Sequence, residues 1–310
     1  MAMVQPALPA QPRRAARRRR QLKGLLTAVL FLAPYTLFFL AFLVWPIFYG
    51  LFISFHKWSL FPGQNEPFVG LDNYRTLLSD QEWWTALQNT VEFTIITVVL
   101  TFVVALGAAM LVSANLKGQT LFRLIFFAPV VLSVAVVGLV WTSMWNTDIG
   151  LVNNLLNRVN LPSVEWLSSV NLVIPSLSIT TAWWGFGLPM IIFLAGLRGI
   201  PPSLYDAAKV DGAGPGAVFV RITLPLLRPT ILFVLVTQII AQFQVFGQPL
   251  ILTNSGGPGT ASMTVILYLY QVAWKFYNLG YAATIAFALA LIMGVVTAIQ
   301  FIFLGREVEY

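Results

Sequence analysis

The sequence predicts an all-α integral membrane protein with six transmembrane helices. Three observations support this fold class: a very low charge content, six long apolar segments, and an uneven distribution of Lys and Arg. Of the 310 residues, 58% are hydrophobic and only 9% are charged, whereas a soluble domain carries about 25% charged residues. Because a water-exposed surface needs charged side chains, we expect most of this chain's surface to face lipid.

Six apolar segments are each long enough to cross a membrane. They are residues 25–55, 90–113, 124–145, 172–197, 229–252 and 279–304. A helix rises 1.5 Å per residue, so about 20 residues cross a hydrocarbon core of about 30 Å. Prolines occur inside four of the segments, at Pro34, Pro46, Pro129, Pro175, Pro189 and Pro249. In a helix bundle, neighbouring groups satisfy the carbonyls that a proline frees, so these segments can still cross.

The positions of Lys and Arg indicate which side of the membrane each loop occupies. Six crossings place both termini on one side, and 14 of the 18 Lys and Arg residues fall on that side. The other four are Lys57, Arg75, Arg158 and Lys275. Since cytoplasmic loops carry the excess of positive charge, we expect both termini in the cytoplasm. We also expect an outer aromatic belt, made of Trp58, Trp83, Trp84, Trp141 and Trp145.

Residues 1–23 read as a basic cytoplasmic leader, expected to be disordered and to contact anionic membrane lipid. Seven of its residues are cations: Arg13, Arg14, Arg17, Arg18, Arg19, Arg20 and Lys23. A cleaved signal peptide is the alternative, because it also begins with basic residues followed by an apolar stretch. The apolar run here continues to Phe55 without a small-residue cleavage site, which favours a retained segment.

Several kinds of chemistry are absent from the sequence. There is no cysteine and only one histidine, His56, which argues against thiolate chemistry, a His-based metal site or a catalytic triad. We therefore expect no catalytic residue and no metal ligand. The net charge of +7 is concentrated in the leader rather than spread over a surface, so we expect no nucleic-acid partner. No G-x-x-x-x-G-K-[ST] phosphate loop is present, so energy from ATP has to come from another subunit.

The loop between residues 198 and 228 predicts a short helix that docks against another protein. Ser203 is expected to cap the start of this helix, with Asp206 in the capping-box position. Gly212 can supply the left-handed residue that ends it. Ala207 and Ala208 are expected to form a smooth face that fits the groove of a partner. After it, Pro215 is expected to restart a helix that presents Phe219 and Ile222 on one face.

This loop resembles the "EAA" loop of binding-protein-dependent ABC permeases, within the sugar-permease branch of the maltose and glycerol-3-phosphate type. The matching positions are Asp206, Ala207, Ala208, Asp211, Gly212, Ala213, Phe219, Ile222, Leu224, Pro225 and Pro229. A later stretch, Leu252 to Pro258, resembles the outer loop of the same branch. One departure is Asp206, where the family usually has Glu; the charge is kept but the side chain is one methylene shorter.

The resemblance implies the six-helix, MetI-like bundle of a type I ABC importer permease. The permease domain would span residues 24–305, with a coupling helix at 202–213 and a cytoplasmic tail at 306–310. The residues implied to contact the ATPase are Tyr205, Asp206, Ala207, Ala208, Asp211, Gly212 and Ala213. The implied partners are a second homologous permease, an ATPase dimer that binds ATP and Mg, and an extracytoplasmic solute-binding protein. The implied location is the cytoplasmic (inner) membrane of a bacterium or archaeon.

Polar residues inside the crossings are candidates for the solute pathway. Gln238 and Gln242 lie four residues apart on one face, where their amides could hydrogen-bond the hydroxyls of a sugar. They could equally bridge neighbouring helices. The resemblance favours a pathway lined by Thr181, Trp184, Gly185, Leu188, Gln238, Gln242 and Phe246. For Gln244 and Gln248, which fall on another face of a continuous helix, we expect helix bridging.

The expected function is import of a small solute, a sugar or oligosaccharide, by alternating access driven by a separate ATPase. A permease for glycerol 3-phosphate or a related phosphodiester is one alternative, although no cation lies within the crossings. An ion-coupled secondary transporter would need ionisable groups in the membrane, and only Glu92 borders a crossing; we expect it to be interfacial. A membrane glycosyltransferase would need clustered carboxylates or a metal motif, and neither is visible.

Overall fold

The computed structural model describes residues 13–61, 67–114 and 118–304. Within these ranges the secondary structure is helical, apart from two isolated β-bridges, His56–Phe68 and Ser59–Asn278. The chain divides into two units, one ending at Ile53 and the other beginning at Ser54. The expected C-terminal tail, 306–310, lies outside the described residues.

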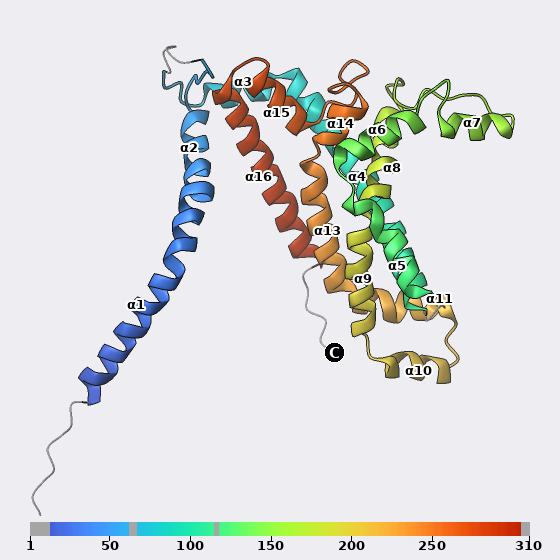
Figure 1. Cartoon of the computed structure of the whole chain (residues 1–310), viewed down its shortest axis with the longest axis horizontal. Helices are drawn as coiled ribbons and strands as arrows, with labels where there is room; N and C mark the ends of the chain where they lie inside the picture. Colours follow the sequence, from blue (N-terminus) through green and yellow to red (C-terminus); the bar gives the residue numbers. More distant parts are fainter. Residues whose placement is uncertain (1–12, 62–66, 115–117, 305–310) are drawn as a thin grey trace, which may run out of the picture. The chain divides into compact units, whose positions relative to one another are not determined.

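The first unit is one long helical rod (Figure 1). It consists of α1 (Arg13–Phe39), a single π-helical turn (Leu40–Val44) and α2 (Trp45–Ser54). The part of the leader from Arg13 onward is helical, so the expectation of a disordered leader is wrong for that part. Arg, Ala, Gln and Leu are all good helix formers, and their helix continues without interruption into the apolar segment.

The second unit is a bundle of helices. Its elements are α3 (Asp72–Ser79), α4 (Gln81–Ser113), α5 (Gln119–Phe127), η2 (Ala128–Val131), α6 (Val134–Met144), α7 (Leu151–Arg158), α8 (Val173–Gly185), α9 (Gly187–Gly199), α10 (Pro202–Val210), α11 (Pro215–Val218), η3 (Phe219–Thr223), α12 (Leu224–Leu226), α13 (Arg228–Phe243), α14 (Gly247–Leu252), α15 (Val265–Trp274) and α16 (Leu279–Leu304). The long helix α4 lies at its centre and packs against α8, α9, α13 and α15.

The predicted number of crossings is present, but half of them are broken, and the fifth runs from Pro215 to Phe243 rather than over the expected 229–252. Three helices are long and apolar enough to cross a membrane, Thr27–Ser54, α4 and α16, and three further bent pairs pass the same test together. The pairs bend by 98° between η2 and α6, by 54° between α8 and α9, and by 68° between α12 and α13. Counting each pair as one crossing gives six, as the sequence predicts.

Proline explains where several of these helices restart. Pro175, Pro189 and Pro249 each occupy the third residue of α8, α9 and α14, and Pro129 lies in the 3-10 turn η2. A proline lacks the N–H that an interior helical residue donates, but the first turn has no acceptor for that N–H. The bundle therefore places these prolines at helix starts, rather than relying only on neighbouring helices to satisfy freed carbonyls.

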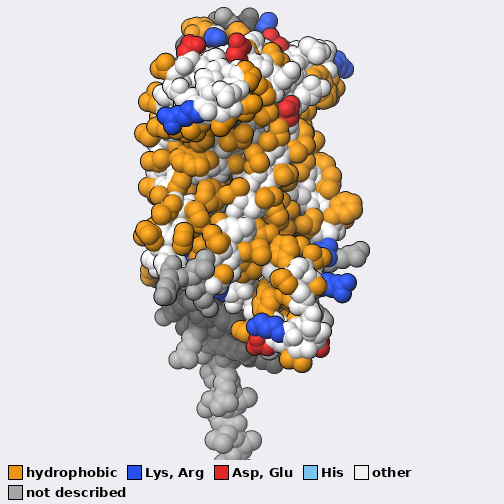
Figure 2. Space-filling model, turned by 90° about the vertical axis from the view of Figure 1, so that its right-hand side faces the viewer, with side chains coloured by type: hydrophobic (Ala, Val, Ile, Leu, Met, Phe, Trp, Pro, Cys, Tyr) orange, Lys and Arg blue, Asp and Glu red, His pale blue; other side chains and the backbone are white. Residues whose placement is uncertain are grey.

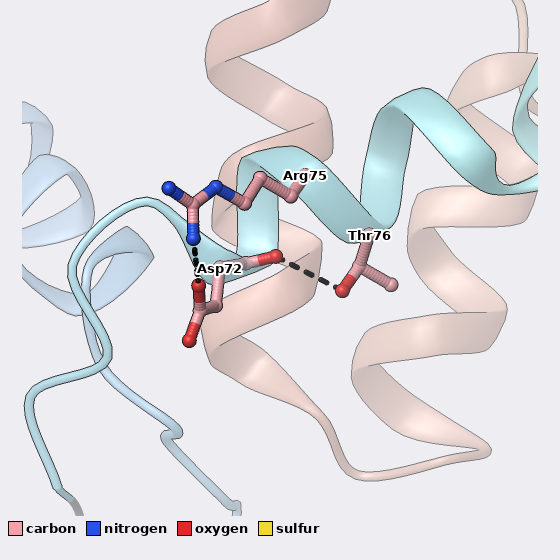
Figure 3. A network of polar contacts seen from close by, with 3 residues as sticks. All are labelled: Asp72, Arg75 and Thr76. Atoms are coloured by element: carbon pink, nitrogen blue, oxygen red, sulfur yellow. Dashed lines mark hydrogen bonds and ion pairs between the residues drawn. The ribbon is translucent and has the colours of Figure 1, made fainter.

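Charged side chains gather at two opposite ends of the second unit, with a band of hydrophobic side chains between them (Figure 2). The helix α10 lies at one end, and α3, α14 and α15 lie at the other (Figure 1). At the α3 end, Arg75 forms an ion pair with Asp72 at 3.0 Å, and the Thr76 hydroxyl donates to the Asp72 carbonyl at 2.9 Å (Figure 3). Both charged side chains are exposed, so this pair contributes about 0–1 kcal/mol.

Three of the five tryptophans expected in an outer belt pack into the bundle instead. Trp83, Trp141 and Trp145 are buried within the chain, so the expected aromatic belt is wrong for these three. The Trp141 ring packs at a tilt against Trp145, and Trp145 packs at a tilt against Trp166 with ring centroids 5.0 Å apart. The Trp145 indole N–H also donates to the Thr180 hydroxyl at 2.9 Å. A buried Trp needs such an acceptor, which ties α6 to α8.

Candidate functional site

A pocket of about 290 Å³ lies where three helix breaks come together. One wall is Val134, the first residue of α6, and a second is Trp184, near the end of α8. The remaining lining comes from the break between α13 and α14: Ala241, Gln242, Gln244, Val245, Phe246, Gly247 and Gln248. Broken helices expose backbone groups and side chains that a continuous helix would cover, and they are typical of solute sites within membranes.

Close approach of two helices sets one edge of this pocket. A Cβ atom on Gly247 would lie 2.7 Å from Cγ2 of Val134, and one on Gly138 would lie 2.6 Å from Cγ2 of Ile251. Only glycine allows α14 to pack this tightly against α6. The tight contact holds α14 at an angle that α13 cannot continue, which fixes the position of the break.

Trp184 connects two of the breaks. Its indole N–H donates to the carbonyl of Leu132 at 3.1 Å. Leu132 lies in the bend between η2 and α6 and has an extended backbone, so its carbonyl has no helical partner. The Trp184 ring lines the pocket, and its N–H holds the bend between η2 and α6 in place.

Three of the seven predicted pathway residues line this pocket: Trp184, Gln242 and Phe246. The Gln242 amide donates to the Gln238 side-chain oxygen at 3.2 Å, so the two share a helix face as the sequence predicts. Phe246 packs against Tyr270 with ring centroids 5.2 Å apart. Gln238 does not line the pocket but orients the amide that does.

The other three predicted pathway residues lie elsewhere. Thr181 is buried, and its hydroxyl donates to the Leu177 carbonyl one turn earlier in α8. Gly185 ends α8, and Leu188 lies beyond the 54° bend with 52% of its surface exposed. The bend separates Leu188 from the stripe that a continuous helix would form with Trp184.

The placement of Gln244 and Gln248 on a different face is wrong, because both line the same pocket as Gln242. The prediction assumed one continuous helix from residue 229 to 252. Instead α13 ends at Phe243, and Phe246 leaves the helical conformation with φ −139° and ψ −53°. Gly247 and Pro249, which disfavour the interior of a helix, were the sequence signal that could have indicated an interruption here.

No charged side chain lines the pocket among the described residues. Three amides, two aromatic rings and apolar side chains make up the wall. Amides both donate to and accept from hydroxyl groups, and aromatic faces cover apolar C–H surfaces. Glu92 is exposed on the surface of α4 and is not part of the wall. The wall is therefore suited to an uncharged, hydroxyl-rich molecule.

The predicted docking helix is present as α10. Pro201 precedes it, Pro202 is its first residue, and no side chain caps its start. The expectation that Ser203 is the N-cap is therefore wrong: the proline occupies the first helical position, where its missing N–H is not needed, and Ser203 falls inside the helix. The Asp206 carboxylate instead pairs with Lys209 at 3.0 Å.

The end of α10 follows the prediction. Gly212 has a φ of +72°, its amide donates to the Lys209 carbonyl at 3.1 Å, and the Ala213 amide donates to the Ala208 carbonyl at 2.9 Å. These two bonds form a Schellman motif, which satisfies the last carbonyls of the helix. The left-handed conformation favours glycine at this position.

The predicted coupling residues divide between two faces of α10. Asp206, Ala207, Asp211 and Gly212 are exposed and available to a partner. Ala208 is buried, which corrects the expectation that it shares an open face with Ala207. Tyr205 and Ala213 are half-buried, and the Tyr205 hydroxyl lies 3.3 Å from that of Thr223.

At the opposite end of the unit, Asp80 ties the start of α4 to two other helices. Its carboxylate accepts from the Glu82 amide at 2.9 Å, from the Tyr268 hydroxyl at 2.5 Å, and from the Tyr281 hydroxyl. Burial opposes ionisation of this carboxyl, but the hydrogen bonds outweigh it and lower the pKa of Asp80. The members of this cluster are far apart in the chain, so no local pattern in the sequence indicates it.

The chain is similar to known proteins over most of its length. The chain is 35% identical over 274 residues to the sulfoquinovosyl glycerol transport system permease protein SmoG of Agrobacterium fabrum, covering 88% of this chain and 89% of the relative. It is 33% identical over 273 residues to the arabinooligosaccharides transport system permease protein AraP of Bacillus subtilis, covering 87% and 86%. The fold matches a bacterial ABC transporter involved in the import of the acidic polysaccharide alginate, with a TM-score of 0.81 and 24% identity, over 94% of this chain and 100% of the other.

Residues 101–307 match the family described as binding-protein-dependent transport system inner membrane component. The matched range covers part of α4 and the helices from α5 to α16, including the pocket and α10. The chain is thus a member of the binding-protein-dependent transport system inner membrane components, the permease subunits of ABC importers.

Proposed function

We propose that this chain is the permease subunit of an importer for an uncharged sugar or oligosaccharide. The observation that carries the proposal is the pocket wall of Gln242, Gln244, Gln248, Trp184 and Phe246, which offers amides and aromatic faces and no charge. Relatives named for sugar transport support the solute class. The uncharged wall of the pocket favours an uncharged solute within that class.

ATP hydrolysis by a separate subunit would be coupled to the pocket through α10. The exposed side of this helix, Asp206, Ala207, Asp211 and Gly212, would dock into a cleft of a cytoplasmic ATPase by helix-in-groove packing. That ATPase, working as a dimer, would bind ATP and Mg, and this chain would need no cofactor or catalytic residue of its own. A second permease of similar fold would complete the solute pathway, and a solute-binding protein would deliver the solute at the opposite end.

The α10 end of the unit would face the cytoplasm, together with both termini. Arg198, Lys209, Arg221 and Arg228 all lie in or next to the loop that carries α10, as the positive-inside rule requires. A permease for glycerol 3-phosphate or a phosphodiester is not favoured, because such a ligand calls for a cation in the wall.

The test is transport by the complete complex in proteoliposomes, loaded with ATP on the side of α10. We expect uptake of uncharged oligosaccharides and little uptake of their uronate counterparts of equal length. Equal or preferred uptake of the uronates would contradict the assignment of an uncharged solute. ATP hydrolysis that did not depend on the solute-binding protein, with no uptake of any saccharide, would contradict the importer itself.

A further inference from the structure

A groove, larger than the pocket described above, lies beside α10 on the side of this helix that faces the bundle. Its volume is about 900 Å³. The wall comes from the ends of α4 and α9, from α10, and from the segment α11–η3. The solute pocket shares none of these lining residues, so this groove is a separate feature of the molecule.

Among the described residues, two charged side chains line the groove, the cations Arg198 and Lys209, and no Asp or Glu does so. Arg198 lies in the last turn of α9, where the helix dipole also favours a cation. Lys209 pairs with Asp206, but both side chains are more than two-thirds exposed, at 74% and 70%. Such an exposed pair is weak, so Lys209 can exchange this partner for a more strongly charged anion.

The rest of the wall is mainly apolar. Met110, Leu197 and Ile200 come from the ends of α4 and α9, two helices of the crossing segments, and Val218 and Phe219 come from α11 and η3. In Figure 2, hydrophobic side chains and Lys or Arg side chains lie next to one another at this end of the unit. A ligand of the groove therefore needs an anionic group joined to an apolar body.

We propose that the groove binds an anionic phospholipid of the cytoplasmic leaflet, with its phosphate between Arg198 and Lys209 and its acyl chains along Met110, Leu197 and Val218. Charge complementarity and position both support a lipid. The groove lies at the ends of two crossing helices, and anionic lipids are concentrated in the cytoplasmic leaflet. This location depends on the orientation assigned under the proposed function; the binding itself does not depend on transport.

The bound lipid would support the docking helix without covering its contact face. Tyr205 and Lys209 line the groove, whereas Ala207 and Val210 lie on the other side of α10 and are exposed. At 100° per residue, positions 205 and 209 share one face and positions 207 and 210 share the opposite one. The lipid would therefore contact the groove side of α10, while a partner docks on the opposite side.

The test measures lipid retained by the full-length chain, in detergent micelles that contain phosphatidylglycerol and phosphatidylcholine in equal amounts. Native mass spectrometry reports which lipid stays bound. A cation near an anionic lipid contributes about a fivefold preference. We therefore expect Arg198→Gln to weaken phosphatidylglycerol retention about fivefold, and Arg198→Gln with Lys209→Gln about 25-fold. Arg198→Lys, which keeps the charge, should retain the lipid.

The matched control is Arg221→Gln, in the same loop but outside the groove wall, and it should retain phosphatidylglycerol like the unmodified chain. Equal retention by the Arg198 and Arg221 variants would overturn the proposal. Displacement of the lipid by inorganic phosphate at the same concentration would also overturn it, because the site would then be one for a free anion. Transport is not measured, so failure here leaves the proposed function intact.

Discussion

The amide of Gln242 offers the sharpest test of the solute pocket. Its side chain lines the pocket and donates to Gln238 at 3.2 Å, which leaves its carbonyl oxygen and one N–H for a solute. Gln242→Leu keeps the approximate size of the side chain and removes both groups. The pocket keeps its approximate shape, so the variant reports the loss of hydrogen bonding, both to the solute and to Gln238.

The size of the effect follows from the number of hydrogen bonds that are lost. One hydrogen bond between neutral groups contributes about 0.5–1.5 kcal/mol, which corresponds to about a twofold to twelvefold change in affinity. Gln244→Leu should have an effect of the same order, because Gln244 lines the same pocket. In the double variant, the fold-changes in affinity of the two single variants should roughly multiply, provided that the two amides contact different hydroxyls of the solute.

The assay is uptake of a radiolabelled oligosaccharide by the reconstituted complex, measured over a range of solute concentrations. We expect a higher half-saturating concentration, with ATP hydrolysis still stimulated by the solute-binding protein. The matched control is Gln81→Leu, an exposed residue at the start of α4, which should leave uptake unchanged. Normal uptake in both Gln242→Leu and Gln244→Leu would refute the assignment of this pocket to the solute pathway.

Three further predictions concern α10 and the Asp80 cluster. Ala207→Glu adds bulk and charge to the exposed face of α10 and should abolish co-purification of the ATPase, whereas Ala217→Glu, at an exposed alanine of α11, should not. Gly212→Ala places a side chain at φ +72°, which costs about 1–2 kcal/mol, so hydrogen exchange of the α10 amides should speed up at least fivefold; unchanged exchange would contradict the Schellman cap. Asp80 has a lowered pKa, so its stabilising contribution is complete above the pKa of an unfolded Asp, about 4, and is lost as the pH falls through the folded value. Asp80→Asn should therefore lower the thermal unfolding midpoint at pH 7. It should also make that midpoint fall less steeply as the pH is lowered; a fall as steep as in the unmodified chain would contradict the role of Asp80.

Much of the fold follows from local properties of the sequence. The apolar segment 279–304 corresponds to α16 residue for residue, because a long apolar run without breakers has one low-energy form in a membrane. The end of α10 at Gly212 was equally predictable, since a left-handed residue that closes a helix is usually glycine. The shared face of Gln238 and Gln242 follows from the helical repeat alone.

The lining of the pocket at the helix breaks was only partly predictable, because helical periodicity assumes that a helix is continuous. Trp184, Gln242 and Phe246 were correctly placed together, whereas Gln244 and Gln248 were excluded from their face. Their assignment depends on where α13 stops, at Phe243. Nothing in the local sequence sets the angle at which the next helix leaves.

The sequence by itself predicted six apolar crossings and a short helix in the loop between residues 198 and 228, since both depend on composition and on spacing within one helix. Only the tertiary structure decided what those segments enclose. The contact between Gly247 and Val134 fixes α14 against α6, and the Trp184 N–H holds the Leu132 carbonyl at the second break. The tertiary structure likewise decides that Ala208 is buried and Ala207 is exposed. Each of these outcomes joins residues from different helices, and the packing between those helices decides which side chains meet.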